Sequence, residues 1–386
     1  MLTAAVCYRR RRFPPHVLPA GLFFGLTLAL PGPQGARTLT LAAPTASLDV
    51  EFTRVAAVRE LADGRVLISD EGEKRLFVGD WKTGSVRPIG REGQGPGEYQ
   101  RPRSLFALAG DSTLLVDALA GRWLLLAGDS IVETIPASAP PLQAGARFPV
   151  GADARGFVVA TRPIGMPAVN RPPSLPPRLD SLYLIRADRR TGALDTLATL
   201  ASRTGRISVT GPADRPTRIE VVLNPFSVGD QPVLFPDGWI AIARIAPYAV
   251  DWIAPDGRVV NGRALPVERV PITEREKRAI LKRQADERGE EPRDPASVRD
   301  WPELLPPFLS SAVLPSGDGS LWIRRTATAD EPRARYDIVS RSGALVARLQ
   351  LKDGEHVAGL GRSAVITVHT DGDGIQRLRR HALPGI

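Results

Sequence analysis

The chain has 386 residues, 43% of them hydrophobic and 24% charged, which excludes a disordered polymer and permits a large buried core. Its one cysteine, Cys7, excludes a disulfide framework and a cysteine-ligated zinc site. The formal net charge is +9, but four arginines lie in the first 36 residues and the other bases are interleaved with acids, so the charge pattern argues against binding of nucleic acid.

The amino-terminal segment has the order of a secretory signal. A basic run at residues 9–12 precedes the apolar run 17–30, and the helix-breaking segment 31–36 follows. The apolar run is shorter than the roughly 20 residues that cross a bilayer. We therefore predict a signal peptide over residues 1–36, cut after Ala36 or Ala43. The mature chain is then exported, periplasmic or extracellular, with no stable membrane span.

Beyond residue 50 the chain repeats one pattern: a turn with glycine, a short apolar run, a polar break and a second apolar run. The clearest copy spans Leu61-Ala-Asp-Gly-Arg-Val-Leu-Ile-Ser-Asp70 and continues to Ile89. Short apolar runs bounded by glycine turns predict strands joined by hairpins. Six copies are recognisable, with their first turns at positions 64, 111, 156, 238, 319 and 361.

The spacing of the copies predicts the fold. The steps are 47, 45, 82, 81 and 42 residues, and three of them fit the roughly 40 to 50 residues of a four-stranded propeller blade. We predict an all-β chain, a six-bladed β-propeller of four-stranded antiparallel blades over residues 37–386. The two long steps hold insertions, at about 162–180, 201–227 and 266–307.

Two insertions have readable structure. Residues 273–288 predict one charged helix, with Thr273 as N-cap and Glu276 three residues on, as in a capping box. Within 206–223, two apolar runs could pair, which leaves a hidden seventh blade open as an alternative.

The last copy has only three strands before the chain ends, so the ring needs a fourth strand from elsewhere. Thr38–Leu41 and Ser47–Phe52 are available near the amino end. We predict that one of them pairs antiparallel with the segment around Ile375 to Arg380. Deleting residues 37–50 is then expected to destabilise the whole ring.

The segment Gly90-Arg-Glu-Gly-Gln-Gly-Pro-Gly-Glu-Tyr99 joins the first copy to the second, and the pairs Asp70 with Arg75 and Asp117 with Arg122 flank the inner hairpins. These residues resemble bacterial exported six-bladed β-propeller proteins with NHL-like repeats. The resemblance is strong over residues 52–126 and fades later, where Thr161 and Arg244 replace the aspartates. It implies the fold and little about a reaction.

Strand order also predicts a working face. In a meander a-b-c-d, the a–b and c–d turns lie on one face of the ring, and the b–c turns and d–a crossings lie on the other. The long connections all belong to the second set, so we expect the ligand on that face. Candidate ligand-binding residues there are Arg91, Glu98, Tyr99 and Arg103. Asp70 and Asp117 are expected to be turn caps.

Catalytic patterns are sparse. The mature histidines, His356, His369 and His381, all lie in the last copy, and scattered surface histidines are the expectation rather than a metal site. Asp371-Gly-Asp-Gly374 favours a hairpin turn over a calcium loop.

Two alternative functions are compatible with these features of the sequence. The first is a non-catalytic exported binding protein without cofactor, expected to be a monomer, that binds a protein, peptide or glycan. The alternative is a propeller hydrolase or lyase with calcium or zinc on the channel axis. The sequence leaves open whether the chain is an enzyme and favours the first.

Overall fold

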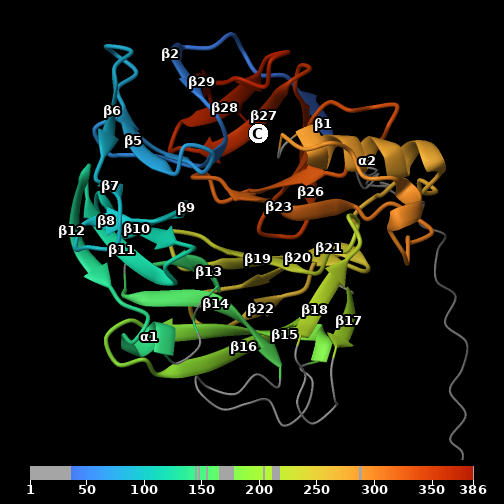
Figure 1. Cartoon of the computed structure of the whole chain (residues 1–386), viewed down its shortest axis with the longest axis horizontal. Helices are drawn as coiled ribbons and strands as arrows, with labels where there is room; N and C mark the ends of the chain where they lie inside the picture. Colours follow the sequence, from blue (N-terminus) through green and yellow to red (C-terminus); the bar gives the residue numbers. More distant parts are fainter. Residues whose placement is uncertain are drawn as a thin grey trace, which may run out of the picture. The chain divides into compact units, whose positions relative to one another are not determined.

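The structure is a computed structural model that describes residues 36–143, 146, 148–153, 155–164, 178–202, 205–210, 218–286 and 289–385. All but the last residue of the predicted signal peptide, and residues 165–177 of the first predicted insertion, lie outside the described residues. The described part is a six-bladed β-propeller whose blades follow one another around the ring in chain order (Figure 1).

Each blade is an antiparallel meander with strand a innermost and strand d outermost. Blade 1 consists of β3 (Val55–Glu60), β4 (Val66–Asp70), β5 (Arg75–Gly79) and β6 (Val86–Ile89). Blade 2 consists of β9 (Pro102–Ala107), β10 (Ser112–Asp117), β11 (Arg122–Ala127) and β12 (Ser130–Ile135). Blade 3 consists of β13 (Phe148–Ala152), β14 (Phe157–Ile164), β15 (Arg178–Asp188) and β16 (Leu194–Ala201).

Blade 4 consists of β19 (Gln231–Leu234), β20 (Ile240–Ile245), β21 (Tyr248–Ile253) and β22 (Val259–Val260). Blade 5 consists of β23 (Phe308–Pro315), β24 (Leu321–Arg325), β25 (Arg335–Val339) and β26 (Leu345–Gln350). Blade 6 consists of β27 (Glu355–Leu360), β28 (Ala364–Thr370), β29 (Gln376–Ala382) and, from the amino end, β2 (Ala46–Phe52).

The amino end closes the ring, as predicted. Strand β2 pairs antiparallel with β29, with Ser47 opposite Arg379 and Leu48 opposite Leu378. The other candidate segment has a different place, because β1 (Arg37–Leu39) runs parallel to β26 as a fifth strand of blade 5. The amino end therefore joins two neighbouring blades.

The core consists of the contacts between blades. Six clusters of buried apolar side chains each lie between two neighbouring blades, so that every sheet is covered on both faces. Tight hairpins permit this stacking, and the turn glycines Gly64 (φ 88°) and Gly238 (φ 87°) take the left-handed backbone that these hairpins require.

The connections carry the remaining elements: β7 (Arg91–Glu92) with β8 (Glu98–Tyr99), α1 (Pro140–Gln143), β17 (Gly205–Thr210) with β18 (Arg218–Leu223), α2 (Glu274–Asp286) and the 3-10 turn η1 (Pro295–Ser297). The predicted pairing within 206–223 is present as the hairpin β17–β18. This hairpin is a two-stranded sheet and not a seventh blade. None of the helices described is both long and apolar enough to cross a bilayer.

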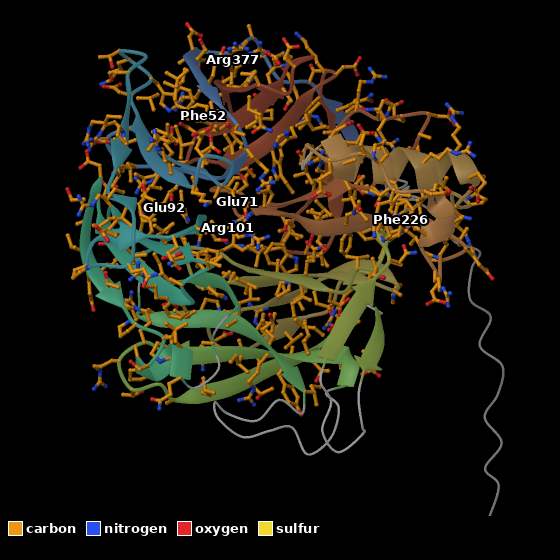
Figure 2. The ribbon with its side chains drawn as sticks, in the orientation of Figure 1. Phe52, Glu71, Glu92, Arg101, Phe226 and Arg377 are labelled. Carbon is orange, nitrogen blue, oxygen red and sulfur yellow. The ribbon has the colours of Figure 1, made fainter. Side chains whose placement is uncertain are left out.

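The insertion before blade 5 packs on its own small core. Ile280 and Leu281 of α2 are buried together with Phe226 and Leu305. Figure 2 marks Phe226 beside this insertion. The two apolar residues lie on one face of an otherwise charged helix, which explains why a sequence with so many charges is held against the propeller.

Candidate functional site

Strand order gives the two sides of the ring different connections. We call the side with the b–c turns and d–a crossings the loop face, and the side with the a–b and c–d turns the turn face. The strand pairs β7–β8 and β17–β18 and helix α2 all belong to d–a crossings. They therefore lie on the loop face.

Two of the predicted site residues, Arg91 and Glu98, make their contacts within the glycine-rich linker (residues 90–99). The Arg91 guanidinium lies 2.7 Å from Glu98 Oε1, and the other carboxylate oxygen accepts the Gly95 N–H at 2.8 Å. These two interactions, the Gly95 N–H first, lower the pKa of Glu98. Arg122 fixes the linker by donating to three of its carbonyls. The bond to Gly95 fits the expectation that Glu98 binds local backbone donors.

The other two predicted residues lie apart. Tyr99 is buried, and its hydroxyl accepts the Leu76 N–H at 3.0 Å and donates to the Ile89 carbonyl at 2.8 Å. This position ties the linker to blade 1. Arg103 is exposed near the loop-face end of β9.

The aspartates that end strand b cap the incoming crossing. Asp70 accepts the N–H groups of Thr53 and Arg54 at 2.8 and 3.0 Å. Asp117 accepts those of Gln100 and Arg101 in the same way. Both side chains are fully buried, and their expected role as turn caps is confirmed.

A charged bridge spans the loop-face ends of blades 1 and 2. The Glu71 carboxylate lies 3.6 Å from the Arg54 guanidinium and 3.2 Å from that of Arg101. Figure 2 shows Glu71 and Arg101 facing each other near the middle of the ring. One carboxylate therefore partly compensates two guanidinium groups where the two blades meet.

None of the predicted site residues lines a pocket of about 410 Å³ that lies on the loop face between α2 and blade 5. We call it the α2 pocket. Its walls are the connection before β19 (Asn224 to Ser227), three residues of α2 with one after it (Ile280, Arg283, Gln284 and Arg293), the start of β23 (Leu309 to Ala312) and the end of β24 (Arg324 to Ala327).

A bulge in the innermost strand of blade 5 forms one wall. β23 pairs with β24 at Phe308 opposite Arg325 and again at Val313 opposite Ile323, so the residues between them face Arg324 alone. Ser311 within this bulge has φ 59°, a left-handed backbone that is strained for a residue with a side chain. The bulge turns two serine residues toward the pocket.

The bulge is held from the neighbouring blade. The Gln231 side chain in β19 accepts the Ala312 N–H at 2.9 Å and donates to the Leu309 carbonyl. One amide therefore satisfies two backbone groups that the bulge removes from the sheet. The wall is fixed before any ligand arrives.

Arg325 is fixed just as firmly. Its guanidinium lies 2.8 Å from the Asp337 carboxylate, donates to the Pro307 carbonyl at 2.8 Å and covers the ring of Tyr248 at 5.0 Å. Asp337 is only 2% exposed and also binds Arg348 and the Tyr248 hydroxyl. Burial of the ring, and then the nearby carboxylate, raise the pKa of Tyr248 well above its usual range.

Helix α2 is attached to the b–c turn of blade 5. Arg283 donates to the Ala327 carbonyl at 3.0 Å, and the Glu276 carboxylate accepts the Ala329 N–H at 3.0 Å. The capping-box position of Glu276 thus serves this attachment, because its carboxylate reaches a neighbouring turn rather than the start of its own helix. The helix forms a fixed wall of the pocket.

The histidines do not gather. His381 is buried between Thr367 and the Ala42 carbonyl. His356 lies on β27, and burial followed by the positive charge of Arg324 lowers the pKa of its imidazole to about 3. Within the residues described, no group of three His, Cys, Asp or Glu side chains could hold a metal ion. Asp371 caps a hairpin turn through the N–H groups of Asp373 and Ile375.

The comparisons agree with this architecture. A family model described as a 6-bladed beta-propeller matches residues 46–119, from the closing strand into blade 2. No curated protein matches the chain.

Solved structures of low identity have a similar arrangement of strands. A protein from Bacteroides fragilis described as exported is 11% identical, with 90% of this chain and 99% of that one covered and a TM-score of 0.48. A gluconolactonase from Xanthomonas campestris is 12% identical, with 87% and 91% covered and a TM-score of 0.42. Regucalcin from Agrobacterium tumefaciens, a calcium-binding protein, is 10% identical, with 90% and 97% covered and a TM-score of 0.37.

Proposed function

We propose that this six-bladed β-propeller is an exported binding protein that holds a small ligand on its loop face, in the α2 pocket. The observation that carries the proposal is the pocket itself, which is built from the insertion helix and from a bulged inner strand. Binding sites are commonly built from variable connections on a rigid scaffold. A volume of about 410 Å³ lies within the roughly 300 to 1,000 Å³ typical of small-molecule sites.

Pre-organisation supports a binding role. Gln231 fixes the bulge, Asp337 fixes Arg325, and Arg283 and Glu276 attach the helix. Each restraint uses a buried or half-buried hydrogen bond within the protein. A ligand that enters such a site loses less free energy to the ordering of loops and side chains.

The composition of the walls favours binding over catalysis. The lining residues that the structure describes offer guanidinium groups, hydroxyls and amides, which bind and orient a ligand. General acid–base catalysis near neutral pH requires a group that exchanges a proton in that range, such as histidine or a carboxylic acid of raised pKa. The described lining contains neither, so we place the chain with binding proteins rather than hydrolases or lyases.

Substitutions of serine to tryptophan on opposite faces of blade 5 test the proposal. Ser310 is exposed in the bulge, and Ser342 is exposed in the c–d turn on the turn face. Melting temperatures are measured with a defined set of sugars, sugar acids, amino acids and nucleotides. We expect Ser310→Trp to abolish the shift of any compound that stabilises the parent, and Ser342→Trp to preserve it. Loss of the shift in Ser342→Trp alone would place binding on the turn face and overturn the proposal.

Export is part of the proposal, because a basic run, an apolar run and a helix-breaking segment open the chain. Expression of the full chain in a Gram-negative host, followed by fractionation and amino-terminal sequencing, tests it. We expect a periplasmic form that begins near Arg37, which keeps β1 intact. A chain recovered uncut from the cytoplasm would contradict export while leaving the pocket assignment open to its own test.

A further inference from the structure

We infer that the α2 pocket recognises an oxyanion: its ligand is a small hydroxylated molecule that carries a carboxylate or phosphate group. The inference rests on the proposed function and adds the chemical class of the ligand. It comes from the charge balance of the walls, from the geometry of the donors and from the size of the space.

The charge balance is one-sided. Four arginines line the pocket, Arg283, Arg293, Arg324 and Arg325, and no carboxylate does so among the described residues. Asp337 compensates Arg325, but it shares its charge with Arg348. Within the described part of the chain, Arg293 and Arg324 have no ion pair and no hydrogen bond. These described residues therefore give the pocket a positive potential.

The charge of Arg324 also acts on a neighbouring imidazole. Burial, and secondly the charge of Arg324, lower the pKa of His356 to about 3. Since His356 lies on the innermost strand of blade 6, the field of Arg324 extends toward the channel as well as the pocket. At the junction of blades 1 and 2, by contrast, Arg54 and Arg101 have a carboxylate partner in Glu71.

The donors fit an oxyanion. A guanidinium is a planar fork of N–H groups that matches two oxygens of a carboxylate or phosphate. Ser310 and Ser311 of the bulge supply hydroxyls that both donate and accept, as hydroxyl groups of a ligand require. The volume of about 410 Å³ exceeds the need of an inorganic ion and accommodates a molecule of roughly the size of one sugar ring.

Four probes of similar size separate charge from shape: glucuronate, glucose 6-phosphate, glucose and glucosamine. Calorimetric titration of the exported protein is expected to show binding of glucuronate, glucose 6-phosphate or both, and none of glucose or glucosamine. Binding of glucuronate alone assigns a carboxylate, and binding of the phosphate ester alone assigns a phosphate. Equal binding of glucose, or no binding of either anion, would overturn the inference.

Charge-neutralising variants locate the site. Arg324→Gln and Arg293→Gln are each expected to weaken anion binding by about tenfold or more, because each removes a charge-assisted hydrogen bond. The matched control is Arg362→Gln, an exposed arginine on an a–b turn of the turn face. It changes the net charge equally and should leave the affinity unchanged. Equal weakening in the control would show unspecific attraction and reject the site.

Melting temperatures show whether these arginines act in ligand binding or in stabilising the fold. Arg293 and Arg324 repel the other positive charges of the pocket, so in the absence of ligand both variants should melt at or above the melting temperature of the parent. A variant that melts lower and binds less would place the arginines in the fold and overturn their assignment. If a neutral compound binds and Ser310→Trp abolishes that binding, the proposed function stands and the oxyanion inference falls.

Discussion

The closure of the ring can be tested at one side chain of the closing strand. Leu48 of β2 is fully buried between blades 6 and 1, among Val66, Ile68 and Leu378. Replacing it with alanine loses the transfer free energy of the removed atoms and leaves a cavity, for which buried leucines cost about 2 to 5 kcal/mol. Walls from two rigid sheets limit the collapse, so we expect Leu48→Ala to lower the free energy of unfolding by about 3 to 4 kcal/mol.

The opposite wall provides a compensating change. A Cβ atom added at Gly79 of blade 1 would lie 2.6 Å from Leu48 Cδ1. Gly79 does not have a left-handed backbone, so alanine there is opposed by side-chain contacts, mainly with Leu48 and to a smaller extent with Val66 Cγ1 at 3.3 Å. Gly79→Ala alone should cost about 1 to 3 kcal/mol through overpacking. In the double variant the new methyl group enters the cavity, and the two costs should fall short of additivity by about 1 to 3 kcal/mol.

Urea unfolding followed by tryptophan fluorescence measures all four members of the cycle. The matched control is Leu119→Ala, a leucine that is 64% exposed in the b–c turn of blade 2, with an expected change within about 0.5 kcal/mol. If Leu48→Ala costs no more than this control, or if the two changes add without coupling, the closing strand does not lie where β2 is described. Deletion of residues 37–50 should be more severe than any single change.

Three further predictions concern buried polar groups. Tyr99→Phe leaves two buried backbone groups unpaired and should cost about 1 to 3 kcal/mol in urea unfolding, with ligand-induced melting shifts unchanged; a change in those shifts would return Tyr99 to the site. Asp337→Asn leaves Arg325 without its counter-charge and should cost about 3 to 5 kcal/mol in the same assay, whereas a loss below 1 kcal/mol would mean that water compensates it. The folded-state pKa of His356, about 3, lies below its ordinary value of 6.5, so the unfolded chain binds the extra proton between these values and stability falls as the pH drops from 6.5 toward 3. His356→Gln should flatten this acid limb in melting curves, and His369→Gln should not; equal slopes for both variants would refute the burial of His356.

The fold was predictable because its determinants are local and repeated. Every blade places a glycine in its first tight turn, and Gly64 and Gly238 occupy equivalent turns far apart in the sequence. The closing strand was predictable by elimination, since the last copy lacks a fourth strand. Its competitor, Thr38 to Leu41, could not be assigned from sequence, because parallel addition to β26 leaves no hairpin signal.

The α2 pocket was harder to predict because it joins four distant stretches, none of which has a motif. Only one feature of the sequence indicates the bulge, the pair Ser310 and Ser311 inside an otherwise apolar strand. Its anchor, Gln231, lies in another blade, and no local pattern indicates such a contact. The glycine-rich linker contains the predicted site residues Glu98 and Tyr99, but these side chains satisfy backbone groups of the linker and of blade 1.

One difference between blades was visible in the sequence and explains where the pocket lies. Strand b ends in an aspartate in blades 1 and 2, and Asp70 accepts N–H groups of the incoming crossing. In blade 5 the same position is Arg325, which instead donates to the carbonyl of Pro307 at the end of its crossing. In blade 4, Arg244 likewise donates to the carbonyl of Thr199 in β16, the last strand of blade 3.

Both arrangements tie a crossing to a blade, but they leave opposite charges on the loop face. An aspartate surrounded by N–H groups is satisfied locally and attracts nothing further. An arginine needs a carboxylate, and Asp251 and Asp337 on strand c supply one in blades 4 and 5. Blade 5 adds Arg324 beside Arg325 without adding an acid to the described lining, and the insertion helix covers both. The replacement of aspartate by Arg325 in blade 5 therefore has two effects: the side chain holds the incoming crossing, and it also lines a positively charged pocket.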